Sequence, residues 1–340
     1  MTHIFFLITL FFTTPDLNKK IPFRKFSFFV LFIFLALRYD YGNDYMAYYD
    51  IHTAINSGLS AWGESDILFK ILNLLISNFY IFIAIISLFY IITIYFLIKD
   101  NLKINQYWFA VLILLINPYL FIIHTSALRQ TIAICFFIFA VNFVFKRKLI
   151  MYIIFILIAT GFHASAVILL PFYFILTESK INKKYIIIIY ALLALLLLTP
   201  LFEIITNKIL EYLPNHYLYY FKQGAQNSIR SMLISSFFFF LIIFNINKLH
   251  GKEIIYGKLS LIATTISLLA VKLSMISRVG MYFDIFLIIT IPQIFVKINK
   301  KINKQFIFLI MITIYILRYY SFFANPLLEK FINYKTILGK

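Results

Sequence analysis

The chain has 340 residues, of which 63% are hydrophobic and only 13% are charged. Charged residues make up about a quarter of an ordinary soluble domain, so this composition excludes a soluble globular fold. The net charge of +18 does not indicate a nucleic-acid partner, because the lysines and arginines lie in small groups between apolar runs, as in the cytoplasmic loops of membrane proteins. The single Cys135 lies in an apolar run, which excludes a disulfide framework and a thiolate metal site.

Apolar segments follow one another along the whole chain. A transmembrane helix needs about 20 mostly apolar residues, and about 17 at the short end. The stretch 67–98 is too long for one span, and we interpret it as an interfacial helix from Asp66 to about Phe79 followed by a true span. The sequence predicts an all-α, polytopic integral membrane protein with about 12 transmembrane helices (roughly 11–14) in a single transmembrane domain over residues 1–340. The apolar segments are 4–14, 26–37, 67–98, 107–122, 127–145, 149–162, 164–177, 185–199, 231–247, 257–273, 279–297 and 305–321.

The basic residues alternate from one connection to the next. Six groups hold nineteen of the thirty-one lysines and arginines. The positive-inside rule places these groups in the cytoplasm, and the remaining connections, including loops 38–66 and 200–230, outside. The six groups are Lys19/Lys20/Arg24/Lys25, Lys99/Lys103, Lys146–Arg147–Lys148, Lys180/Lys183/Lys184, Lys248/Lys252/Lys258 and Lys297/Lys300/Lys301/Lys304.

The segment LRYDYGNDYMAYYDIH, residues 37–52, concentrates polar residues directly after an apolar run. Gly42-Asn43 is a turn signal that folds this segment back on itself. One interpretation is an interfacial belt of tyrosines with an arginine reaching the headgroups. The other is one wall of an outward-facing site, because two acids and an arginine so close together each need a partner. The candidate residues are Arg38, Asp40, Asp44, Tyr45 and Tyr48.

Two arginines begin later apolar helices on the same predicted side. Arg129 and Gln130 open one helix, and Arg278 opens another with Tyr282 four residues on, which is the spacing of one helix face. Arginines next to the positive ends of helices suit a phosphate or pyrophosphate, since a guanidinium can hold two oxygens. Binding of lipid headgroups is the simpler alternative.

His163 lies in the turn GFHAS between two short apolar segments. At 1.5 Å per residue these segments reach only about 20 Å, so the turn is predicted to lie in a recessed region. A histidine in an apolar setting is as often a core residue as a catalytic one. As a general base we rank Asp44 first, His163 second and Asp40 third.

These clusters together resemble the EpsG family of Wzy-type polysaccharide polymerases. The likeness runs in order from about residue 26 to residue 300. Two departures are a short first apolar segment and Asn333-Tyr334 where family members often carry Pro-Tyr. The matching residues are Arg38, Gly42-Asn43-Asp44-Tyr45 and Tyr48, Arg129-Gln130 with Ala133, Phe162-His163 with Ser165-Ala166, and Arg278 with Tyr282-Phe283.

The resemblance implies a multi-pass protein of the bacterial cytoplasmic (inner) membrane, similar to C-type integral-membrane glycosyltransferases, with its site facing the periplasm. It implies polymerisation of undecaprenyl-pyrophosphate-linked oligosaccharide repeat units into O-antigen, capsule or exopolysaccharide, without a metal or cofactor. A chain-length regulator and a flippase are the implied protein partners.

Three other activities stay open at this point. A flippase for lipid-linked oligosaccharides would need arginines deep in several spans, whereas here they gather at the outer ends. A membrane O-acetyltransferase would need to reach a cytoplasmic acyl donor. The predicted position of His163 on the outer side argues against this activity. A ligase that moves glycan onto a lipid core shares the donor chemistry.

Overall fold

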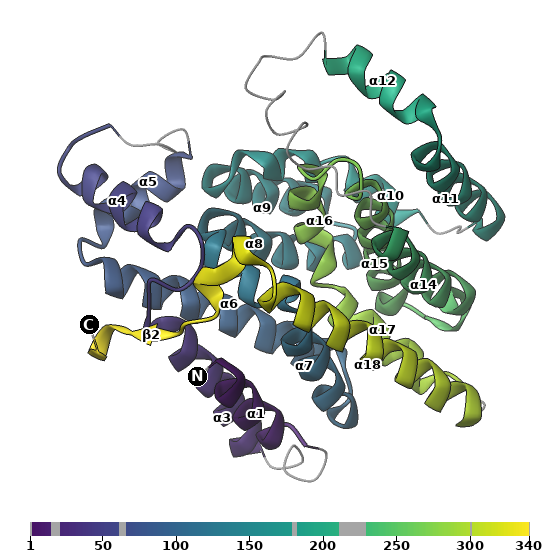
Figure 1. Cartoon of the computed structure of the whole chain (residues 1–340), viewed down its shortest axis with the longest axis horizontal. Helices are drawn as coiled ribbons and strands as arrows, with labels where there is room; N and C mark the ends of the chain where they lie inside the picture. The colour runs from purple at the N-terminus through teal and green to yellow at the C-terminus, as the bar shows by residue number, and fades with distance from the viewer. Residues whose placement is uncertain are drawn as a thin grey trace. The chain divides into compact units, whose positions relative to one another are not determined.

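The computed structural model describes residues 2–14, 21–60, 66–178, 182–210, 229–299 and 301–339 (Figure 1). The chain divides into two compact units. Unit 1 comprises Met1–Tyr173 and Ile298–Lys340, and unit 2 comprises Phe174–Lys297. Helices dominate both, and the two strands in the described residues have two residues each, so the predicted all-α class is confirmed. The single transmembrane domain and its external loops stay predictions; residues 61–65 and 211–228 of those loops lie outside the described residues.

Unit 1 carries the elements that form the candidate site. Its α-helices are α1 (Thr2–Phe12), α3 (Ile21–Ala36), α4 (Tyr45–Asn56), α5 (Ile67–Leu75), α6 (Phe79–Asn101), α7 (Tyr107–Ile116), α8 (Leu128–Phe145), α9 (Leu149–Phe162) and α18 (Lys301–Phe323). Its 3-10 helices and strands are β1 (Arg38–Tyr39), η1 (Ile104–Gln106), η2 (Pro118–Leu120), η3 (Ile122–Ser126), η4 (Ala164–Leu169), η6 (Pro326–Phe331), β2 (Lys335–Thr336) and η7 (Ile337–Gly339).

Unit 2 follows α10 (Phe172–Thr177), in which the boundary between the units falls. Lys258 of this unit is buried, and its Nζ donates hydrogen bonds to the carbonyl oxygens of Ile175 and Leu176 at the end of α10, at 3.0 and 3.3 Å. The elements of unit 2 are α11 (Lys183–Leu198), α12 (Pro200–Leu210), α14 (Ile229–Asn245), η5 (Ile246–Lys248), α15 (Lys252–Leu269), α16 (Ile276–Asp284) and α17 (Leu287–Val296).

The described helices fit a multi-pass membrane protein, but the predicted number of about twelve spans is not confirmed. Four helices within the described ranges are long and apolar enough to cross a membrane: Phe79–Asn101, Leu128–Phe145, Ile229–Lys248 and Ile302–Phe323. The number rises to six if α11 with α12 and α16 with α17 each count as one bent span. The bends are 86° and 50°.

One predicted span is broken for a local reason, and the same reason ends another where it was predicted to end. In the predicted span 107–122, helix α7 ends at Ile116 because the next residue, Asn117, precedes a proline and is extended (φ −105°, ψ 97°). Thr199 is extended in the same way before Pro200, which separates α11 from α12. In 107–122 the apolar run therefore continues past the end of the helix, whereas the predicted span 185–199 ends where α11 ends.

The long apolar stretch 67–98 divides where it was predicted to divide. Helix α5 ends at Leu75, and Asn78 begins α6 as its N-cap. The Asn78 side chain accepts hydrogen bonds from the backbone N–H groups of Tyr80 and Ile81, at 2.9 and 3.1 Å, which satisfies donors that the first turn of a helix leaves unpaired.

In unit 1, α4 and α5 lie side by side (Figure 1).

The polar segment after α3 is held by the C-terminal part of the chain. Strands β1 and β2 pair antiparallel. Asp40 forms a 2.7 Å ion pair with Lys330, and Asn43 Nδ2 donates a 2.8 Å hydrogen bond to the Leu327 carbonyl. These contacts place the start of loop 38–66 and the end of the chain together, as expected if both lie on one side of the membrane.

Gly42 forms the predicted turn of this segment. Its φ of +101° lies in the left-handed region, where residues with a side chain are strained. A Cβ at Gly42 would also lie only 2.7 Å from Ser126 Oγ and 2.9 Å from Thr125 Oγ1. The glycine therefore allows the polar segment to pack closely against η3, another segment that the charge alternation predicts to lie outside.

Candidate functional site

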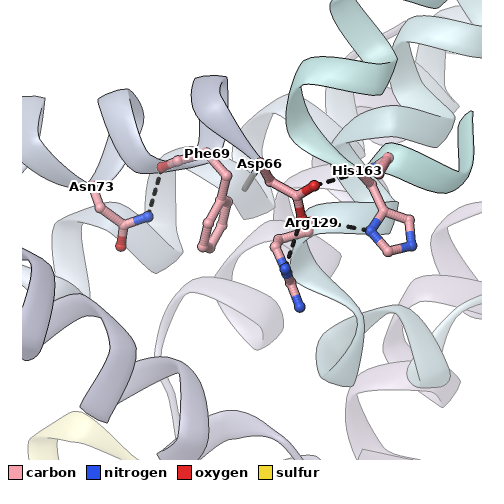
Figure 2. A network of polar contacts seen from close by, with 6 residues as sticks. Asp66, Phe69, Asn73, Arg129 and His163 are labelled. Carbon is pink, nitrogen blue, oxygen red and sulfur yellow. Dashed lines mark hydrogen bonds and ion pairs between the residues drawn. The ribbon is translucent and has the colours of Figure 1, made fainter. Parts of the chain in front are cut away.

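Asp66 is the centre of a buried polar network in unit 1 (Figure 2). It is the N-cap of α5, where aspartate commonly accepts an N–H of its own helix, but it makes no such bond here. Its Oδ2 lies 2.7 Å from Arg129 Nη1 and 3.8 Å from His163 Nδ1. Its Oδ1 accepts a 3.1 Å hydrogen bond from the backbone N–H of Ala164. We call Asp66, Arg129, His163 and the Ala164 N–H the Asp66 cluster.

Three helix ends position this cluster. Asp66 precedes α5, Arg129 is the second residue of α8, and His163 ends α9 in an extended conformation (φ −155°, ψ 111°). Gly161 allows the close approach of α5 to the last turn of α9, because a Cβ there would lie 2.7 Å from the Leu68 side chain. The cluster therefore depends on helix packing and not on any one local motif.

The cluster excludes most solvent but is not sealed. The side chains of Asp66 and Arg129 are 3% and 10% exposed, whereas the His163 side chain is 19% exposed. The imidazole is therefore the member that a substrate reaches most easily. The aromatic ring of Phe69 lies under the guanidinium, with its centroid 5.9 Å from Arg129 Cζ.

The electrostatics favour an ionised Asp66. Burial by itself would raise the pKa of this carboxyl, but His163, Arg129 and the Ala164 N–H all stabilise the anion, and the net pKa is lowered. The Asp66 carboxylate is thus available to balance a positive charge on either Arg129 or His163.

The two tyrosines predicted in the site lie on the buried face of α4. Tyr48 lies against the Phe69 ring, with ring centroids 5.9 Å apart, and close to the Arg129 guanidinium; burial nevertheless raises the pKa of its phenol. Tyr45 lies against Phe79, at 5.4 Å between centroids. Both belong to an apolar cluster that joins α4, α5, α6 and α8, so Tyr48 connects the polar segment 37–52 to the Asp66 cluster.

The other predicted residues of unit 1 lie elsewhere. Arg38 is buried at the end of α3 and donates hydrogen bonds to the Leu35 carbonyl and to Ser87 Oγ. Gln130 is buried in α8. Asp40 is paired with Lys330, and Asp44 is exposed at the N-cap of α4, so neither aspartate belongs to the Asp66 cluster.

The remaining predicted pair belongs to unit 2. Arg278 and Tyr282 are one helical turn apart in α16, as the spacing predicts. Their environments differ, because Arg278 is exposed whereas Tyr282 is fully buried.

Sequence reasoning missed Asp66, although it placed the residue at a helix start. In the sequence an aspartate directly before an apolar helix is an ordinary N-cap, and nothing local indicates that its side chain turns away from that helix. In the part of the chain that the structure describes, no group of three or more histidines, cysteines, aspartates and glutamates could hold a metal ion. Independence of a metal stays a prediction.

The fold and the cluster define a multi-pass membrane protein in which polar groups from three helix ends meet in a buried, ion-paired site. Comparison with protein families matches residues 22–336 to the EpsG family. The chain therefore belongs to the EpsG family, a family of Wzy-like polysaccharide polymerases, as the sequence motifs predicted. Searches of curated proteins and of solved structures find no significant match.

Proposed function

We propose that the protein is a glycosyltransferase that polymerises undecaprenyl-pyrophosphate-linked oligosaccharide repeat units. The reaction takes place on the outer (periplasmic) face of the bacterial cytoplasmic membrane and releases undecaprenyl pyrophosphate. Membership of the EpsG family supports the polymerase activity. The structural observation that carries the proposal is the Asp66 cluster, since it joins three polar segments that the charge alternation assigns to the outer side.

The cluster suits the proton transfer that this reaction needs. A hydroxyl of one lipid-linked unit attacks the anomeric carbon of the glycan on another, and the bond from that carbon to the pyrophosphate oxygen breaks. The hydroxyl proton passes to His163, and the pyrophosphate leaves with the electron pair. Asp66, 3.8 Å from Nδ1, stabilises the imidazolium that forms, as a buried carboxylate does beside other catalytic histidines. The activated donor supplies the energy, so no cofactor is needed.

The remaining candidates are assigned to the substrates. Arg129, kept in place by Asp66, is proposed to hold the donor pyrophosphate, and Arg278 of unit 2 is a separate candidate for that role. Asp44 and Asp40 are the alternative bases to His163. Tyr45, Tyr48, Gln130 and Tyr282 are proposed to contact glycan or phosphate, whereas Arg38 is fully buried at the end of α3 and is not assigned to a substrate. The bilayer carries both lipid-linked substrates, and a flippase and a chain-length regulator are the expected protein partners.

Deletion followed by a surface-glycan ladder tests the function. In the deletion strain, we expect one repeat unit on each lipid core and no longer chains, and a plasmid copy should restore the ladder. Loss of all repeat units would instead indicate a flippase or a ligase and would contradict polymerisation.

The first substitution prediction identifies the base. His163→Gln is expected to lower turnover of purified protein about 10²- to 10⁴-fold, the usual contribution of a general base, while binding of the lipid-linked donor persists. Asp50→Asn, which changes an exposed aspartate of α4, is the control for an uninvolved carboxylate. If Asp44→Asn is inactive and His163→Gln turns over normally, Asp44 is the base and the proposed role of His163 is wrong.

The second prediction concerns the orientation in the membrane. Ser57 follows α4 and Arg147 lies between α8 and α9, and both are exposed. In a Cys135→Ala background, Ser57→Cys should react with an impermeant thiol reagent in intact cells, whereas Arg147→Cys should react only after permeabilisation. The reverse result would place the Asp66 cluster in the cytoplasm.

A further inference from the structure

Arg38 is a buried cation, and no acid in the described part of the chain forms an ion pair with it. Its side chain is among the largest that are fully buried in the protein, with the residue 2% exposed. Nη1 donates to the Leu35 carbonyl and, at 3.0 Å, to Ser87 Oγ, while Nε has no hydrogen-bond partner in the protein. The titratable side chains that influence its pKa are three tyrosines, Tyr45, Tyr334 and Tyr41, and not carboxylates.

This guanidinium lines a small pocket of about 10 Å³ between α3, α6, η3 and α8. A space of that size accepts about one water-sized group. Its polar wall comes from Arg38, Ser87, His124, Thr125 and Thr131, and Tyr90, Phe121 and aliphatic side chains form the rest.

The hydroxyl groups of this wall already donate within the protein. Ser87 donates to the Ile83 carbonyl at 2.7 Å, Thr125 to Ile122 at 2.8 Å and Thr131 to His124 at 3.0 Å. Among the described residues, the Arg38 guanidinium donates only through Nη1, so it is the group of the wall with donor capacity left for an occupant of the pocket.

The charge of the pocket favours an anion over water. Burial lowers the pKa of Arg38 to about 10, so the guanidinium is still protonated at neutral pH. Burial also lowers the pKa of His124 to about 4, so the imidazole is neutral and the pocket carries one positive charge. An uncompensated buried charge is costly. In addition, Leu128 and Thr131 belong to the first turn of α8, an 18-residue helix whose positive end favours a negative group.

We propose that the pocket bounded by Arg38, Ser87 and His124 binds one small monovalent anion, which is chloride in ordinary salt. The anion accepts from the Arg38 guanidinium and connects the end of α3 to the beginning of α8. The site does not depend on the polymerase function.

Chloride itself is the probe. Purified wild-type protein is transferred to sodium gluconate, and the unfolding temperature is followed as sodium chloride replaces gluconate at constant ionic strength. A ligand that binds only the folded state raises this temperature. We expect a rise of at least about 2 °C for wild type. Bromide should act as chloride does, and sulfate at equal ionic strength should not.

Two substitutions locate the effect. Arg38→Gln removes the buried charge and should abolish the chloride response, whereas Lys335→Gln removes an exposed charge from the neighbouring strand and should retain it. Excess broadening of the ³⁵Cl resonance should likewise be present with wild type and Lys335→Gln and absent with Arg38→Gln.

The wild-type titration also decides the question if Arg38→Gln does not fold. Equal unfolding temperatures in chloride and gluconate would overturn the proposal and indicate a water in the pocket. An equal chloride response in folded Arg38→Gln would also overturn it, and stabilisation by sulfate or inorganic phosphate but not by chloride would show a site for a larger anion.

Discussion

Replacement of Asp66 by asparagine is expected to remove nearly all polymerising activity and to lower the free energy of unfolding by about 3–5 kcal/mol, the usual effect of breaking a buried ion pair. The amide has the shape of the carboxylate but not the charge that holds Arg129 Nη1 at 2.7 Å and faces His163 at 3.8 Å. Arg129 would then be a buried cation without its partner carboxylate. Turnover with lipid-linked substrate and unfolding in detergent measure the two effects.

The double variant Asp66→Asn/Arg129→Gln separates stability from catalysis. Removing both charges should recover much of the stability lost in either single variant, because no buried charge is left, but activity should stay low. Asp50→Asn, on the exposed face of α4, should change neither property. If the two single losses of stability simply add in the double variant, Asp66 and Arg129 do not act as a pair.

The stability difference between wild type and Asp66→Asn should depend on pH. The folded-state pKa of Asp66 is lowered from the ordinary value of 3.8, so its stabilising effect is fully present above that value. It is lost as the pH falls through the folded-state pKa. The two proteins should therefore differ in unfolding at neutral pH and converge in strong acid.

Gly42→Ala is expected to destabilise the protein by about 1–3 kcal/mol and to reduce polymerisation. Alanine is strained at a φ of +101°, and its Cβ would meet Ser126 Oγ at 2.7 Å and Thr125 Oγ1 at 2.9 Å. The polar segment would have to move away from η3, and α4 with Tyr48 follows directly on that segment. Thermal unfolding and the surface-glycan ladder are the measurements.

Gly58→Ala is the matched control for this substitution. Gly58 also has a positive φ, +73°, but a Cβ there meets nothing within 4 Å. Only the backbone strain applies, so the loss should be about 1 kcal/mol and the glycan ladder should be normal. Equal effects at the two glycines would show that the close packing of Gly42 against η3 has no functional importance.

Features that depend on the local order of residues could be predicted from the sequence. The turn at Gly42 follows from a glycine next to an asparagine, and the division of the stretch 67–98 follows from its excess length. The sequence also predicted that segments around residues 42, 129 and 163 share one side, and contacts through Gly42 and Asp66 bring them together. The predicted number of about twelve spans is not confirmed. Hydropathy counts apolar residues along 107–122 but does not show that Asn117, which precedes a proline, ends α7 within that stretch.

The sequence by itself determined the class of protein, the grouping of its polar segments and two members of the Asp66 cluster, Arg129 and His163. These follow from apolar length, charge alternation and motif order, respectively, which are properties of the chain. Only the tertiary structure decided their partner. Asp66 is 63 residues from Arg129 and 97 from His163 in the sequence, and only the packing of α5 against α9 beside Gly161 brings its carboxylate to them. The packing of α3 against α6 likewise decided that Arg38 is buried without an ion pair to any described carboxylate, since a cation's partner depends on distances across helices and not on its neighbours along the chain.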